Sequence, residues 1–178
     1  MSAVDTAVLT RQHVVEKRDI PKVDYHCHIS MTEYTDPANP TIVTVSQEEF
    51  IADLQEAGID KAIVLSDKRT TPQQVAEFCS KAPDRFIGFG YVNPILNGAE
   101  VDARMQREEM GLHGLKLYPC SDGYKPDDTH AFKVYEVASE LGMPVMFHHA
   151  GMPTEYDYLY HTDPAQIDVI AQCFPELM

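Results

Sequence analysis

Short apolar runs alternate along this chain with segments whose apolar residues recur at helical spacing. The runs are nearly continuous, which is typical of strands buried on both faces of a parallel sheet. They predict strands at 23–29, 61–67, 85–93, 112–118 and 144–149. Helices are predicted after them, at about 47–57, 72–82, 99–110, 129–141 and 164–173.

The segments between these elements carry their own signals. Ser46 precedes two acidic residues, and Thr71 precedes a proline, so both are predicted to cap the N-termini of helices. Residues 31–44 contain several Thr, Pro, Asn and Asp residues and are predicted to form a long loop. The acidic segment around Asp122, Asp127 and Asp128 is predicted to be a solvated loop.

Five strand–helix units in succession predict a parallel sheet covered by helices. A doubly wound open sheet that binds a nucleotide would need a glycine-rich loop after the first strand, and this sequence has none there. The pattern therefore favours the (β/α)8 TIM-barrel type. Because a closed barrel needs about eight units, residues 21–178 are expected to form a partial barrel, preceded by a polar N-terminal arm at residues 1–20.

The first predicted strand carries the sequence Asp-Tyr-His-Cys-His at residues 24–28. Side chains alternate faces along a strand, so His26 and His28 are predicted to share one face, with Asp24 in line behind them and Cys27 on the other face. Two imidazoles on one face at the end of a strand can bind a single metal ion. A pair of surface histidines on a strand is the alternative.

The other predicted strands also end in residues that can bind a metal or form hydrogen bonds. In a barrel the carboxyl ends of the strands meet at one face, where active sites lie. We therefore expect one polar pocket, with His148 as a metal ligand. The residues expected to bind substrate are Asn93, Lys116, Tyr118 and His149.

Two of these assignments have alternatives. Adjacent strand residues face opposite ways, so only one of His148 and His149 points into the pocket easily, and His149 is then a substrate-binding or loop residue. Lys116 is unexpected in an apolar strand. It is predicted to anchor substrate or, if carbamylated, to bridge metal ions; the alternative is a side chain that extends along the strand to solvent.

Charge and cysteine spacing restrict the class of protein. With 14 basic and 28 acidic residues, the formal net charge is −14, which argues against binding to nucleic acid or to anionic membranes. No secretory signal and no apolar segment long enough to cross a bilayer is evident, so a cytoplasmic protein is expected. The four cysteines form no CxxC pair and are expected to be free thiols.

Four motifs together resemble the amidohydrolase-related metal-dependent hydrolases (amidohydrolase 2). They are DYHCHI at 24–29, GLKLYP at 114–119, PVMFHHAG at 144–151 and FPEL at 174–177. The same branch contains the aminocarboxymuconate-semialdehyde-type decarboxylases. The resemblance implies that His26, His28 and His148 bind a divalent ion, expected to be zinc, with manganese or another ion as alternatives.

The same resemblance places a further ligand histidine on a sixth strand and a catalytic or metal-binding aspartate on an eighth. Neither is in this sequence, so the catalytic residue stays unassigned and the chain is expected to be a fragment lacking strands 6–8. TatD-type deoxyribonucleases also begin with an Asp-x-His-Cys-His strand, but they carry a glutamate in the third strand, and residues 86–93 contain no acid. The polymerase-and-histidinol-phosphatase-type phosphoesterases use more His and Asp ligands and rank lower as well.

The expected function is hydrolysis of a small organic substrate by a metal-activated water. Non-oxidative decarboxylation of a small carboxylic acid on the same metal is the first alternative. An inactive fragment and a non-catalytic binding domain are the others. The expected partners are a small-molecule substrate and a second copy of the chain in a homodimer.

Overall fold

The computed structural model describes residues 20–33, 39–150 and 158–178, so most of the predicted N-terminal arm lies outside the described residues. Five strands form one parallel sheet, and their order in the sheet follows their order in the chain. This is the arrangement expected of a partial TIM barrel. The strands are β1 (Val23–Cys27), β4 (Lys61–Leu65), β5 (Phe86–Gly90), β6 (Gly114–Leu117) and β7 (Val145–Phe147).

A helix follows each of these strands, as predicted. The helices are α2 (Gln47–Glu56), α3 (Pro72–Ser80), α4 (Ala99–Glu108), α6 (Phe132–Glu140) and α7 (Ala165–Cys173). Ser46 and Thr71 each form a capping box with the residue three positions later, so both predicted caps are confirmed. Two short elements were not predicted, α5 (Pro119–Asp122) and the 3-10 helix η1 (Leu159–Thr162). None of the described helices is long and apolar enough to cross a membrane.

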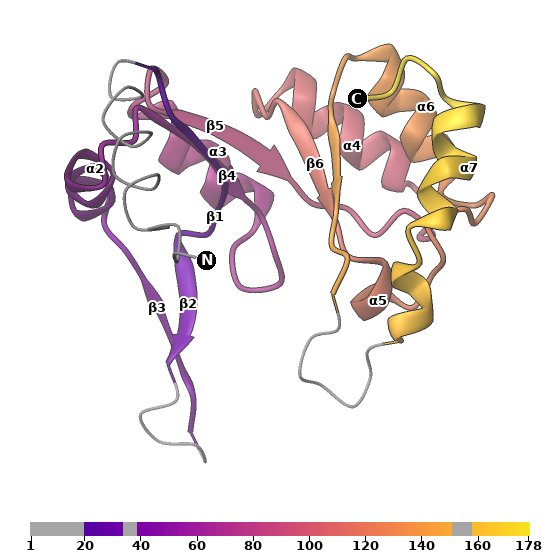
Figure 1. The fold of residues 1–178 in the computed structure, drawn as a ribbon, viewed down its shortest axis with the longest axis horizontal. Coiled ribbons are helices and arrows are strands. Elements are labelled where there is room, and N and C mark those ends of the chain that lie inside the picture. Colours follow the sequence, from indigo (N-terminus) through magenta and orange to yellow (C-terminus); the bar gives the residue numbers. More distant parts are fainter. Residues whose placement is uncertain (1–19, 34–38, 151–157) are drawn as a thin grey trace, which may run out of the picture.

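The prediction of a loop at residues 31–44 is wrong for most of the residues that the structure describes there. Strands β2 (Ser30–Glu33) and β3 (Thr41–Thr44) pair there as an antiparallel hairpin, with Ser30 opposite Thr44. The Thr-Ile-Val-Thr sequence of β3 is rich in β-branched residues, which favour strands. The hairpin extends away from the main sheet (Figure 1).

The buried apolar side chains of the described residues form two separate clusters, which define an N-terminal and a C-terminal half. In the N-terminal half, β1, β4 and β5 pack against α2 and α3 around Val64, Val75 and Phe86. In the C-terminal half, β6 and β7 pack against α4, α6 and α7 around Leu115 and Tyr135. Figure 1 shows β5 running from one half towards β6 in the other. The halves are therefore joined mainly through the β5–β6 edge.

Candidate active site

A pocket of about 370 Å³ opens where the carboxyl ends of the strands meet. The N-terminal half contributes His26, His28, residues 67–69 of the segment after β4, and two residues of β2. The C-terminal half contributes Tyr118, Ser121 and His148. The pocket therefore lies between the two halves, at the end of the sheet where barrel enzymes place their active sites.

The histidine pair comes from the end of β1. His26 and His28 line the same pocket, with their ring centroids 5.4 Å apart. Between Asp24 and Cys27 the pairing with β4 shifts by one residue, so β1 has a bulge there. The bulge takes Asp24 out of the alternation that the sequence predicted, and its Oδ1 accepts the backbone N–H of His26 at 3.0 Å.

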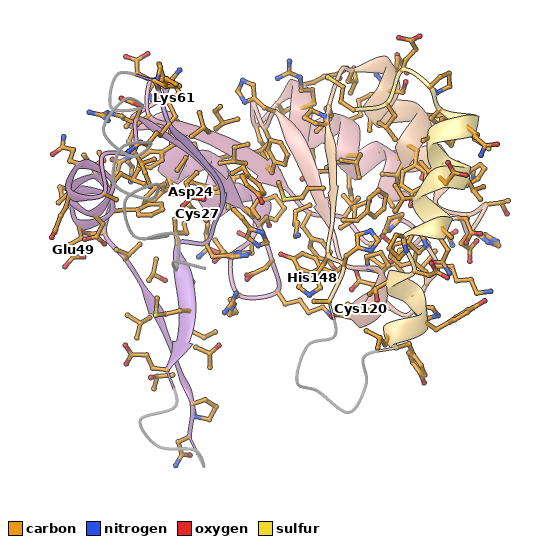
Figure 2. The ribbon with its side chains drawn as sticks, in the orientation of Figure 1. Asp24, Cys27, Glu49, Lys61, Cys120 and His148 are labelled. Atoms are coloured by element: carbon orange, nitrogen blue, oxygen red, sulfur yellow. The ribbon has the colours of Figure 1, made fainter. Side chains whose placement is uncertain are left out.

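Cys27 turns away from the pocket and into the apolar cluster of the N-terminal half, as predicted. Figure 2 shows its side chain beside that of Asp24 and far from His148. Burial, with a further contribution from Asp24, raises the pKa of the Cys27 thiol to about 12. Cys27 is therefore a core residue, and the pocket lining does not include it.

Desolvation favours the neutral form of His26 and His28. It lowers the pKa of His26, and the positive charge of Lys116 lowers it further. Burial also lowers the pKa of His28, where the carboxylate of Asp67 acts in the opposite direction. Neutral imidazole is the form that donates a lone pair to a metal ion. Both shifts therefore favour the protonation state that a metal site needs.

Asp67 lies beside His28, with Oδ2 3.3 Å from the Nδ1 atom of the imidazole. At this distance the carboxylate would attract a proton on Nδ1, although the contact does not meet the geometry of a hydrogen bond. The carboxylate also pairs with the guanidinium of Arg69, whose Nε donates to Oδ2 at 2.9 Å. Sequence reasoning gave Asp67 only as a polar strand end and did not identify Arg69. The sequence does carry a signal for this turn, because an Asp directly after a buried strand often accepts backbone N–H groups of the next residues in an Asx turn.

The pocket wall from the C-terminal half is aromatic, and the buried side chain of Lys116 lies close to it. The rings of Tyr118 and His148 have centroids 5.5 Å apart. Lys116 is only 1% exposed, and its Nζ lies 5.3 Å from the centroid of the Tyr118 ring. The alternative in which Lys116 extends to solvent is therefore wrong. Burial lowers the pKa of the Lys116 ammonium to about 8.

Of the four residues predicted to bind substrate, only Tyr118 is in the pocket lining, while Lys116, His149 and Asn93 lie outside it. His149 is exposed, and its Nδ1 lies 2.9 Å from the carbonyl oxygen of Thr162. The Oδ1 of Asn93 accepts the backbone N–H of Ile95 at 3.4 Å, which turns the chain after β5. The strand alternation that favoured His148 over His149 as a pocket residue agrees with this placement. The predicted substrate-binding roles of Asn93, Lys116, Tyr118 and His149 stay predictions.

The prediction of a solvated loop at Asp122 is wrong. Its side chain is 2% exposed. The hydroxyl of Tyr91 donates to Oδ1 at 2.9 Å, and the Nζ of Lys68 lies 3.4 Å from the same oxygen. Burial raises the pKa of the carboxyl group, and these two partners oppose that shift. Asp122 therefore helps to hold Lys68 at the edge of the pocket.

The chemistry of the pocket fits a divalent metal ion, while the ligand set is incomplete. His26 and His28 offer imidazoles on one wall, and His148 offers a third on the facing wall. Within residues 20–33, 39–150 and 158–178, no three His, Cys, Asp or Glu side chains form a group that holds an ion as they stand. Binding would therefore require His148 to approach the histidine pair, or a further ligand.

A family model described as an amidohydrolase matches residues 23–177 of the chain. The chain belongs to the amidohydrolase family. No curated protein matches it significantly. The match confirms the resemblance that the strand-end motifs indicated, and it covers all of the pocket residues.

Solved structures confirm the barrel fold of this amidohydrolase-family chain. One is 2,6-dihydroxybenzoate decarboxylase from Rhizobium, with a TM-score of 0.64 and 17% identity over 88% of this chain and 64% of that protein. Another is 5-carboxyvanillate decarboxylase from Novosphingobium aromaticivorans with bound manganese, with a TM-score of 0.58 and 21% identity over 76% of this chain and 49% of that protein. A third is a probable 2-pyrone-4,6-dicarboxylic acid hydrolase from Acinetobacter baumannii, with a TM-score of 0.53 and 18% identity over 74% of this chain and 50% of that protein.

Because all three structures are below 25% identical to this chain, the similarity extends to the fold alone. The chain spans about half to two thirds of their length. Its five strand–helix units therefore correspond to part of a complete barrel.

Proposed function

We propose that this chain carries the metal-binding wall of a metal-dependent hydrolase, with His26 and His28 as ligands and His148 as the third. The observation that carries the proposal is that the imidazoles of His26 and His28 line one pocket at the carboxyl end of the sheet, where desolvation lowers the pKa of both. Zinc is the proposed ion, because it accepts imidazole ligands readily. Manganese, which the related 5-carboxyvanillate decarboxylase binds, is the alternative.

When bound, such an ion would lower the pKa of a water molecule and polarise a carbonyl or carboxylate group. The chain's own residues would bind and orient the substrate. Arg69 and Lys68 line the pocket, and the Nζ of Lys116 lies 5.3 Å from the centroid of the Tyr118 ring. In a chain with a net charge of −14, these cations mark the pocket as a place that attracts a small anion.

Decarboxylation of a small carboxylic acid is the second candidate. The two cations of the pocket lining, Lys68 and Arg69, suit a substrate that enters as a carboxylate. Two of the three similar structures described above are decarboxylases of aromatic acids. Tyr118 would support this reaction by offering an aromatic face to the ring of such a substrate.

The metal proposal is tested by calorimetric titration of the metal-free chain with Zn²⁺ and with Mn²⁺. We expect about one ion per chain. His26→Ala and His28→Ala should each lower the affinity more than ~100-fold, which exceeds the usual loss when a residue that only hydrogen-bonds to a metal ligand is replaced. His148→Ala should weaken binding as well. The matched control is His113→Ala, because His113 is exposed and outside the pocket lining. Unchanged affinity in His26→Ala and His28→Ala would refute the metal site.

The two reactions are then separated with the metal-loaded chain. Hydroxybenzoic acids labelled with ¹³C in the carboxyl group report decarboxylation as released ¹³CO₂. Cyclic and linear esters and amides of small acids report hydrolysis as the acid formed. Product from the esters or amides without labelled CO₂ supports the hydrolase, and the reverse supports the decarboxylase. Neither product from a chain that binds the ion would refute both activities for this chain.

A further inference from the structure

The carboxylate of Asp67 is held in place by several hydrogen bonds. Its Oδ1 accepts the backbone N–H of Arg69 at 2.8 Å and that of Thr70 at 2.9 Å. The backbone N–H of Asp67 donates to the carbonyl oxygen of Thr70 at 3.0 Å, which closes the turn from the other side. The residue is 8% exposed. One carboxylate oxygen is thus used to hold the turn, and the orientation of the other follows from it.

That second oxygen, Oδ2, has two neighbours. The guanidinium of Arg69 donates to it, and the Nδ1 atom of His28 lies 3.3 Å away. In the described structure this Nδ1 is buried and has no hydrogen-bond partner. A neutral imidazole carries its proton on one nitrogen and a lone pair on the other. A lone pair on Nδ1 would face a carboxylate and be repelled, whereas a proton there is stabilised.

We propose that Asp67 is a positioning residue that fixes the tautomer of His28, with the proton on Nδ1 and the lone pair on Nε2. Metal-binding histidines are commonly oriented in this way, by a carboxylate at the nitrogen that does not bind the ion. The role of the tautomer in metal binding rests on the proposed function above. The tautomer itself does not, because Asp67 and His28 are in contact in the metal-free chain.

Asp67→Asn separates this role from simple turn formation. The amide oxygen can still accept the two backbone N–H groups of the turn. The amide nitrogen then takes the place of Oδ2 and presents a donor to Nδ1 of His28, which favours the opposite tautomer. Asp122→Asn is the matched control, because Asp122 is also a buried carboxylate beside the pocket but pairs with Tyr91 and Lys68.

The experiment is nitrogen-15 NMR of the imidazoles in the metal-free chain labelled with ¹⁵N-histidine, with His28→Gln used to assign the signal. We expect the Nδ1–H tautomer in the parent and in Asp122→Asn, and the Nε2–H tautomer in Asp67→Asn. Zn²⁺ affinity should fall about 10- to 100-fold in Asp67→Asn. If this variant does not fold, the tautomer of the parent decides.

An Nε2–H tautomer in the parent would overturn the proposal. So would an Nδ1–H tautomer that persists in a folded Asp67→Asn variant, since Asp67 would then only shape the turn. If the tautomer changes as expected while the parent binds neither Zn²⁺ nor Mn²⁺, the positioning role stands and the proposed metal function fails. The two hypotheses can therefore fail separately.

Discussion

The two halves of the molecule build their walls of the pocket by different means. In the N-terminal half, polar contacts orient the side chains: Asp24 bonds to the backbone of His26, and Asp67 closes a turn beside His28. In the C-terminal half, burial does so, because all four residues of β6 are buried, Lys116 included. Hydrogen bonds therefore contribute most to the wall from the N-terminal half, and close packing contributes most to the wall from the C-terminal half. Different kinds of substitution should therefore disturb them.

The comparison also shows where the two walls are joined. The pairing of β4 with β5 extends from Ala62 and Phe86 to Leu65 and Phe89, whereas β5 and β6 pair only at Phe89–Gly114 and Gly90–Leu115. The hydroxyl of Tyr118 adds a hydrogen bond to the carbonyl oxygen of Ser66, 3.2 Å away, at the end of β4. Few contacts therefore set the spacing between the histidine pair and His148.

The largest effect on this junction is expected from Gly114→Ala. A Cβ at Gly114 would lie 2.5 to 2.7 Å from three ring atoms of Phe89, closer than packed carbon atoms allow. The ring or the strand would have to move, at a cost of about 3 kcal/mol in the free energy of unfolding. Urea denaturation of the parent and the variant measures this loss.

A double-mutant cycle gives the control. Phe89→Leu removes the far end of the ring, so Gly114→Ala should cost much less in that background than in the parent. Equal costs in both backgrounds would show that the ring of Phe89 does not set the spacing of the β5–β6 edge.

The second-largest effect is expected from Lys116, the buried charge beside the wall from the C-terminal half. The folded chain releases the Lys116 proton near pH 8, because burial disfavours the ammonium, whereas the unfolded chain holds it to about pH 10.5. Between these values the unfolded state binds more protons, so the Lys116 contribution to stability rises with pH. Lys116→Met should therefore be more stable than the parent near pH 7, by about 2 kcal/mol, and lose this advantage as the pH approaches 10.

The measurement is the difference in unfolding free energy between Lys116→Met and the parent at several pH values. Differences are needed because other buried groups act in the opposite direction: burial raises the pKa of Cys79 to about 12, and such groups lower stability at alkaline pH in both proteins. A difference that is constant from pH 7 to pH 10 would mean that Lys116 titrates normally in the folded chain.

The same contrast explains what could be predicted from the sequence. The five strands and their helices follow from local signals, such as the apolar run at 61–65 and the caps at Ser46 and Thr71. The pocket histidines follow from alternation near the ends of β1 and β7. Each of these depends on residues close together in the chain, and the family match confirms the fold they indicated.

What was missed depends on contacts between distant residues. The burial of Lys116 requires neighbouring strands on both sides, and Asp122 is buried by Tyr91, 31 residues earlier. The bulge in β1 is visible only in its register with β4. The β2–β3 hairpin was taken for a loop because its strands are short and mostly exposed, so no buried face marks them in the sequence.

The smallest effect tests whether the hydrogen bond between the halves differs from one inside a half. Tyr118→Phe removes the bond to Ser66, and Tyr135→Phe removes a bond of the same kind to Pro126, 2.8 Å away within the C-terminal half. Each should lower the free energy of unfolding by about 1 kcal/mol. If the junction sets the spacing of the walls, only Tyr118→Phe should also weaken Zn²⁺ binding, by a few-fold. Equal Zn²⁺ affinities in the two variants would show that the β5–β6 edge alone keeps His148 opposite the histidine pair.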